Sequence, residues 1–164
     1  MKNALLFLVL FFALKNYGQE ASKKREFAFS PGILWQDEIF AEANVLVGKV
    51  IIEKAMVGMS GITAGLETNF KSGHEFTVAP KIGIESDMTI ASVRLSAINY
   101  FQDGNSELRL VPEIGLSFGG FANLTYGYGF ILANDHIQNA SQHRLSLRFT
   151  FNKRLIREGL PLMY

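Results

Sequence analysis

Side chains along most of this chain alternate between apolar and polar, and this alternation limits the folds available to it. In residues 143–151 (HRLSLRFTF), leucines and phenylalanines alternate with two arginines, a serine and a threonine. Successive side chains of a β-strand point to opposite faces, so this segment has one apolar face and one charged face. Residues 74–85, 107–118 and 122–132 repeat the pattern. The chain is therefore predicted to consist of amphipathic strands.

Turn-forming residues interrupt the alternation at short intervals. The expected breaks lie at residues 37–38, 53–56, 71–73, 86–88, 103–105, 119–120 and 134–141. All four aspartates fall in these breaks, as expected for a residue type that favours turns. Seven breaks separate eight segments without helical periodicity, which predicts an all-β antiparallel fold. We expect a bulge where the alternation slips at residues 98–100, and a bulge or strand end at Pro80 and at Pro112.

The first residues have the character of an export signal. Lys2 precedes an apolar run at residues 4–14, which is too short to cross a bilayer as a helix. We expect residues 1–18 to be a signal peptide and the protein to be exported. The chain has no cysteine, so we expect neither disulfides nor a lipid-modified N-terminal cysteine. Its net charge of +1 gives no indication of a nucleic-acid partner.

The polar faces of the strands indicate what the apolar faces contact. They carry many small residues and charges of both signs, which is typical of a crowded barrel lumen. The apolar faces are almost free of charge, as expected for a closed barrel whose outer side meets lipid. The alternative is a soluble, lipocalin-like carrier, which would reverse the two faces. In that case an apolar ligand would lie among Phe76, Ile114, Tyr128 and Phe149.

Residues 26–152 resemble the small eight-stranded outer-membrane barrels of the OmpA/OmpX-like group. The most specific feature is RLSLRFTF, in which Leu145, Leu147, Phe149 and Phe151 are similar to the C-terminal signal read by the barrel-insertion machinery. The resemblance implies an all-β, eight-stranded, antiparallel up-and-down transmembrane β-barrel in the outer membrane. The tail, residues 153–164, departs from the group's pattern. It is too short for a peptidoglycan-binding domain, and we expect it to be frayed.

The resemblance also implies partners and an orientation. We expect a monomer that contacts outer-membrane lipid and the insertion machinery, has no cofactor or metal, and is not an enzyme. An even number of strands places both termini on the periplasmic side and the 134–142 loop outside the cell. The candidate contact residues of that loop are Asp135, His136 and Asn139. A lipid A-modifying barrel enzyme is a further alternative, because His136 resembles part of a deacylase His-x-Ser-Asn motif, but Gln138 occupies the serine position.

The charged residues of the polar faces are the main functional candidates. We predict that they form a charge network in the lumen, made of Glu42, Glu67, Lys81, Arg94, Arg109, Glu113, Arg144 and Arg148. Arg94 is expected to lie between Lys81 and Glu113. Eight strands leave an interior just wide enough for side chains, so such a network would fill the lumen and block conduction. The predicted role is structural or interactive, within the cell envelope.

Overall fold

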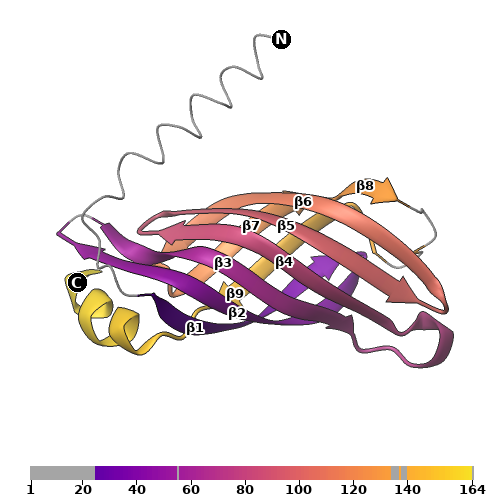
Figure 1. Cartoon of the computed structure of the whole chain (residues 1–164), viewed down its shortest axis with the longest axis horizontal. Helices are drawn as coiled ribbons and strands as arrows, with labels where there is room; N and C mark the ends of the chain where they lie inside the picture. The colour runs from indigo at the N-terminus through magenta and orange to yellow at the C-terminus, as the bar shows by residue number, and fades with distance from the viewer. Residues whose placement is uncertain (1–24, 55, 134–136, 138–139, 164) are drawn as a thin grey trace, which may run out of the picture.

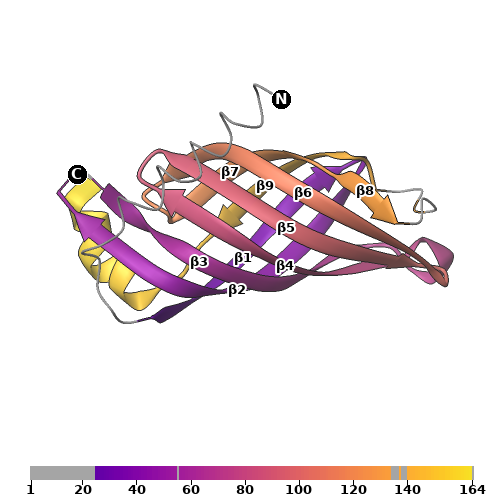
Figure 2. The same ribbon diagram turned by 45° about the horizontal axis from the view of Figure 1, so that its top comes forward.

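The strands form one closed antiparallel barrel (Figure 1). The computed structural model describes residues 25–54, 56–133, 137 and 140–163. Its strands are β1 (Glu26–Gln36), β2 (Glu38–Glu53), β3 (Met56–Asn69), β4 (Thr77–Met88), β5 (Ala91–Gln102), β6 (Asn105–Phe118), β7 (Ala122–Tyr128), β8 (Phe130–Ala133) and β9 (His143–Phe149). Their order is β5-β4-β3-β2-β1-β9-β7-β6-β8, and β5 also pairs with β6, which closes the sheet (Figure 2).

β7 and β8 are two halves of one barrel strand. Both pair with β6, and only Gly129 separates them. The Gly129 amide donates a hydrogen bond to the backbone oxygen of Gln142, at 2.7 Å, which continues the β7–β9 register beyond Tyr128 and His143. The barrel therefore has eight strands, which confirms the predicted strand number and antiparallel arrangement.

The hairpin turns lie mostly where the sequence predicts them. Asp37 and Asp103 adopt positive φ angles of 60° and 47°, and Gly104 follows with φ of 78°. Asp, Asn and Gly tolerate this left-handed conformation, which tight hairpins require. The predicted break at residues 86–88 is wrong, because β4 continues to Met88. Asp87 is a buried strand residue whose carboxylate accepts hydrogen bonds from side chains of β5.

The expected bulge in β5 is absent, and the prolines lie within strands. Inward and outward positions alternate along all of β5, because Ile98 and Tyr100 point into the barrel. The β4–β5 register is the same on both sides of these residues. Pro31, Pro80 and Pro112 each lie at a gap in the pairing with one neighbouring strand. A proline has no amide hydrogen to donate, so these strands lose a local hydrogen bond without ending.

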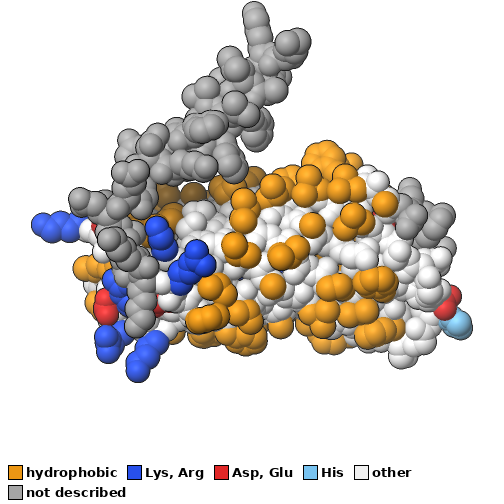
Figure 3. Space-filling view, in the orientation of Figure 1, with side chains coloured by type: hydrophobic (Ala, Val, Ile, Leu, Met, Phe, Trp, Pro, Cys, Tyr) orange, Lys and Arg blue, Asp and Glu red, His pale blue; other side chains and the backbone are white. Residues whose placement is uncertain are grey.

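Apolar side chains cover the outer surface of the barrel (Figure 3). Phe27, Trp35 and Ile114 are 71%, 64% and 66% exposed, although a soluble protein rarely exposes a continuous apolar surface of this kind. Apart from Lys49, and from Glu26, Glu38 and Glu53 at strand ends, the charged strand residues instead point inward and are almost fully buried. The apolar-out, polar-in prediction is therefore confirmed.

Two apolar clusters lie inside the barrel, one near each end. We call the end with the β1–β2, β3–β4 and β5–β6 connections the loop end, and the end with residue 25 and the C-terminal helical segments the terminus end. The cluster at the loop end is formed by Leu34, Phe40, Ala79, Ile98, Tyr100, Val111, Ile137 and Ala140. The cluster at the terminus end is formed by Ala28, Leu46, Val50, Val57, Met59 and Leu155. The charged residues lie mainly between these clusters, so the lumen has an ionic middle and apolar ends.

The C-terminal segment closes the terminus end instead of fraying. It forms two short helical segments, η2 (Leu155–Gly159) and η3 (Leu160–Met163), which lie against the barrel end (Figure 1). The side-chain oxygen of Asn152 accepts hydrogen bonds from the backbone amides of Arg154 and Leu155, at 2.9 and 2.8 Å. It therefore caps the first turn of the helical segment. Leu155 is fully buried in the apolar cluster. Within the described part of the chain, no helix has the length and hydropathy needed to cross a membrane.

Candidate functional site: the charged lumen

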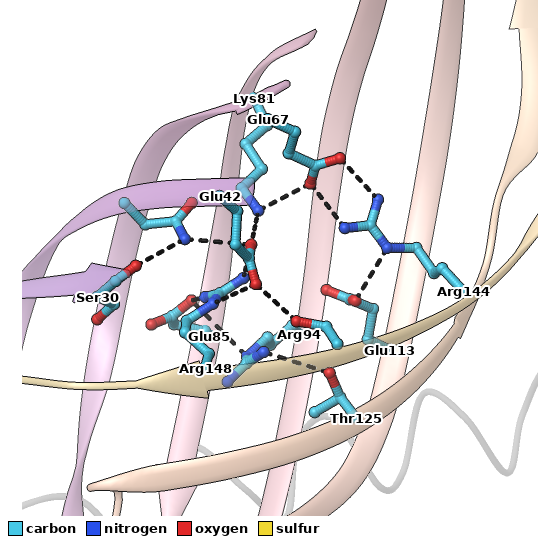
Figure 4. A network of polar contacts seen from close by, with 12 residues as sticks. Ser30, Glu42, Glu67, Lys81, Glu85, Arg94, Glu113, Thr125, Arg144 and Arg148 are labelled. Atoms are coloured by element: carbon cyan, nitrogen blue, oxygen red, sulfur yellow. Dashed lines mark hydrogen bonds and ion pairs between the residues drawn. The ribbon is translucent and has the colours of Figure 1, made fainter. Parts of the chain in front are cut away.

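All eight predicted network residues point into the lumen and are buried. They come from six strands, β2, β3, β4, β5, β6 and β9. Several of their ion pairs, such as those of Glu42 with Lys81 and with Arg148, connect strands that are not neighbours in the sheet (Figure 4). A carboxylate or guanidinium in such a position loses its water, and must be paired to be tolerated. The pairing therefore determines what this site can do.

Glu42 is the centre of the network. Its carboxylate forms ion pairs with Lys81 of β4 and with Arg148 of β9, the latter at 3.1 Å. It also accepts a hydrogen bond from the Ser146 hydroxyl, at 2.6 Å. Arg148 extends the network to Glu85, at 2.6 Å. One carboxylate on β2 thus joins two strands that lie on different sides of it.

A second branch of the network runs through Arg144. Its guanidinium contacts Glu67 of β3 at 2.6 Å and Glu113 of β6 at 3.2 Å, so it spans the barrel. Glu67 also contacts Lys81, at 2.8 Å, which joins this branch to Glu42. The buried Tyr100 hydroxyl lies 3.2 Å from Glu67 and accepts a hydrogen bond from Arg144 at 3.1 Å.

Arg94 does not occupy the predicted position between Lys81 and Glu113. The register pairs it with Glu85 on one side and Glu113 on the other. Its guanidinium contacts Asp87 at 3.2 Å and lies 3.9 Å from Glu85. Lys81 lies four residues before Glu85 in β4, opposite the apolar Ile98 of β5. The Arg94 side chain thus contacts the nearest buried carboxylates. One of them belongs to Asp87, which the sequence predicts to lie in a turn.

Arg109 belongs to a separate cluster at the loop end. It pairs with Glu107 on its own strand, and its guanidinium carbon lies 4.7 Å from the centre of the Tyr100 ring. It also donates hydrogen bonds to the backbone oxygens of Ala140 and Ser141, at 2.6 and 2.7 Å. Arg109 therefore holds the last residues of the 134–142 loop against the barrel.

Three lumen acids were not among the predicted network residues: Glu85, Asp87 and Glu107. Glu85 and Glu107 lie on the polar faces of their strands, so the alternation was a signal that could have found them. Asp87 could not be found in this way, because the turn preference of aspartate placed it outside a strand. With these three, six acids face five bases in the described lumen, which leaves nearly balanced charge.

The other predicted site residues lie outside the lumen. Leu145, Phe149 and Phe151 are 43%, 46% and 53% exposed on the outer wall, and Leu147 is partly exposed there. Phe151 lies just beyond β9 and pairs with Phe29. Asp135, His136 and Asn139 fall outside the described residues, as does Gln138. In the part of the chain that the structure describes, no group of three histidines, cysteines or acids is placed to hold a metal ion.

The lipocalin-like alternative is wrong. Three of its proposed ligand-lining residues, Phe76, Ile114 and Phe149, are 46%, 66% and 46% exposed on the outside of the barrel. The interior that would receive an apolar ligand instead contains the buried ion pairs. An apolar molecule there would have to separate paired charges that would then stay buried, at a high cost in free energy.

Comparisons with family models, with curated proteins and with solved structures give no match to this chain. The features established for it are the closed eight-stranded barrel and the charged network inside it.

Proposed function

We propose that this chain is a non-enzymatic outer-membrane barrel whose lumen is closed and whose role is structural or interactive. The observation that carries the proposal is the inverted polarity of the wall. Paired charges fill the inside, while residues such as Ile82 and Leu116 are 60% and 70% exposed outside. A barrel satisfies all backbone hydrogen bonds between strands, which is the condition for crossing a bilayer with strands. In water this outer surface would be an aggregation hazard.

The positions of the outer aromatic residues support a membrane-spanning orientation. Aromatic side chains form girdles at both interfaces of membrane barrels, since their rings suit the headgroup level. The exposed aromatics near the loop end are Trp35, Phe70, Phe76, Phe101 and Phe130. Those near the terminus end are Phe27, Phe29, Phe118 and Phe151. These two groups would mark the two edges of the lipid-facing band.

The network supports a closed lumen. Arg144 and Arg148 reach from β9 to carboxylates of β3, β6, β2 and β4, so side chains cross the barrel in its middle. The apolar clusters close both ends. An ion entering this path would have to displace paired charges from each other. We therefore expect no conductance, and place the function in the surfaces at the barrel ends.

Partners and orientation follow from the same proposal. The chain would insert as a monomer through the barrel-insertion machinery, with Leu145, Leu147, Phe149 and Phe151 as its recognition residues. Both described termini lie at the same end of the barrel, which would face the periplasm. The 134–142 loop would then be available to partners outside the cell.

The single tryptophan of the chain offers a direct test of the membrane location. Trp35 is 64% exposed on the outer wall. The protein is refolded into phosphatidylcholine vesicles whose acyl chains carry bromine, which quenches tryptophan fluorescence at contact distance. Strong quenching, together with a shift in gel mobility on heating, is the expected result. Unquenched Trp35 in a folded, soluble protein would overturn the proposal.

The closed lumen is tested separately by planar-bilayer recording. Purified protein that has passed the quenching test should give no discrete conductance steps. Regular steps would show that the lumen conducts, and would refute the structural role while leaving the membrane location intact.

A further inference from the structure

A row of basic side chains interrupts the apolar outer surface near the terminus end. Glu26 pairs with Gly48, so the register places Arg25, just before β1, beside Lys49 of β2. Lys49 in turn pairs with Ser60 of β3. Arg25 and Lys49 are exposed and Ser60 is partly exposed, all on the outer wall. Two cations and a hydroxyl therefore lie side by side across three strands.

Lys153 extends this row on the other side of β1. Phe151 pairs with Phe29, and the Asn152 side chain donates a hydrogen bond to the backbone oxygen of Phe27, at 2.8 Å. Asn152 is buried, and Lys153, the first residue of the C-terminal helical segment, is exposed beside it at the same end of β1. We refer to Arg25, Lys49, Ser60 and Lys153 as the basic row.

The cations of the basic row have no acidic partner among the described residues. Arg154 differs, because it contacts Glu26 and Glu158, each at 3.1 Å, and Arg157 contacts Glu158 at 3.2 Å. Arg25 and Lys49 stand directly across from each other, where like charges destabilise a strand pair. An anion bound between them would remove this repulsion.

The two ends of the barrel also differ in charge. The described residues around the terminus end include six bases, Arg25, Lys49, Lys54, Lys153, Arg154 and Arg157, against three acids, Glu26, Glu53 and Glu158. Among the described residues, the loop end has four exposed or partly exposed acids, Asp37, Glu38, Glu75 and Asp103, against Lys71. Figure 3 shows blue side chains gathered at the terminus end, next to the apolar surface. The positive charge is thus concentrated on one rim.

We propose that the basic row binds the phosphate of an anionic glycerophospholipid in the leaflet next to the chain termini. This inference rests on the proposed membrane location. The phosphate would lie on Arg25, Lys49 and Lys153, while the acyl chains lie along the apolar wall that begins at Phe27. The Ser60 hydroxyl lies beside the row but donates its hydrogen bond to the backbone oxygen of Glu85, at 3.3 Å. A soluble anion would use only the charges, whereas a phospholipid fits both the charges and the adjoining apolar surface. Each cation near an anionic membrane surface strengthens binding by about fivefold.

Native mass spectrometry of the detergent-solubilised protein tests this directly. The probes are phosphatidylglycerol and phosphatidylethanolamine of the same chain length, added at equal concentration. Wild-type protein should retain phosphatidylglycerol preferentially. In the triple variant Arg25→Gln/Lys49→Gln/Lys153→Gln, the ratio of bound phosphatidylglycerol to bound phosphatidylethanolamine should fall more than tenfold. Lys71→Gln, at the opposite end, is the matched control and should behave as wild type.

The outcomes separate this inference from the proposed function. Equal retention of both lipids by wild type, or an unchanged preference in the triple variant, overturns the basic row as a lipid site even if brominated lipid quenches Trp35. A barrel that leaves Trp35 unquenched overturns both, since no leaflet would then reach the row. If Lys71→Gln reduces the preference by as much per charge removed as the triple variant does, the binding reflects overall charge, and the proposed site is wrong.

Discussion

The inner and outer walls of the barrel place different demands on the same strand. Along β9, Arg144 and Arg148 each contact two particular carboxylates, at distances of 2.6–3.2 Å. Leu145 and Phe149, which alternate with them, are 43% and 46% exposed and have no such partner requirement. The inner wall therefore depends on which residue meets which, whereas the outer wall depends only on apolar character. Substitutions that respect or violate this distinction should have very different costs.

The largest effect is expected inside, at Glu42. Replacing it by glutamine leaves Lys81 and Arg148 without the carboxylate that both contact. Loss of one partner of a buried ion pair costs about 3–5 kcal/mol, because the remaining charges stay buried. Reversible urea unfolding in detergent micelles, followed by Trp35 fluorescence, should show this loss in the free energy of unfolding.

The control for this prediction lies on the same strand. Glu53 ends β2 and is exposed, so Glu53→Gln makes the same chemical change without burying a charge. We expect it to change the free energy of unfolding by no more than about 0.5 kcal/mol. Equal effects of the two substitutions would mean that the ionic lumen contributes nothing specific.

The next largest effect is expected on the outer wall, at Leu147. If the barrel spans a bilayer as proposed, Leu147→Arg places a charge in the lipid and costs about 2–4 kcal/mol in vesicles. Leu147→Ile keeps the apolar character and should be close to neutral. Phe27→Arg, near the terminus end of β1, should cost only about 0–1 kcal/mol, because the penalty falls toward the interface. Equal losses in the free energy of unfolding for these three variants would argue against lipid contact.

The fold was largely predictable because alternation with period two specifies both strand and face. The eight strands, the apolar outer wall and the inward direction of the eight charged residues all follow from that local pattern. Inward apolar residues such as Ile98 and Tyr100 were misinterpreted as a bulge, because an apolar side chain inside a polar lumen breaks the pattern without breaking the strand. Only the cluster at the loop end explains their position.

The partners within the site could not be predicted. Arg148 reaches Glu42 and Glu85 across the lumen, and such contacts depend on barrel tilt and register, which no single segment specifies. The inward position of Leu155 was missed for a related reason. Its segment carries no alternation, and its place in the apolar cluster depends on surfaces of strands distant in the sequence.

A smaller effect is expected from Leu155→Ala, at the apolar end of the lumen. Removing this fully buried side chain should cost about 2 kcal/mol, near the lower limit for leucine truncation in a core. The cost is limited because the C-terminal segment can detach while the strands remain paired. Hydrogen exchange should therefore rise in residues 153–163, with no change in β3 or β4. Ile156→Ala, at a position 42% exposed, is the control and should leave exchange unchanged.

The smallest effect is expected at the loop end, where side chains face neither the lumen nor the apolar outer wall. His74, next to β4, lies 2.6 Å from Asp103 of the β5–β6 turn, and both side chains are exposed. The hydrogen bond to Asp103, followed by its negative charge, raises the pKa of His74 above its ordinary value of 6.5. A raised pKa in the folded state means that the contact stabilises the fold below pH 6.5, and that this contribution disappears as the pH rises through the raised value.

Titration of the His74 ring protons by NMR should show the raised pKa, and Asp103→Asn should return it toward 6.5. A wild-type pKa equal to that of the variant would show that the contact does not persist in solution. Because both groups are exposed to water, we expect the associated change in unfolding to be much smaller than at Glu42, which again separates the interior of the barrel from its surface.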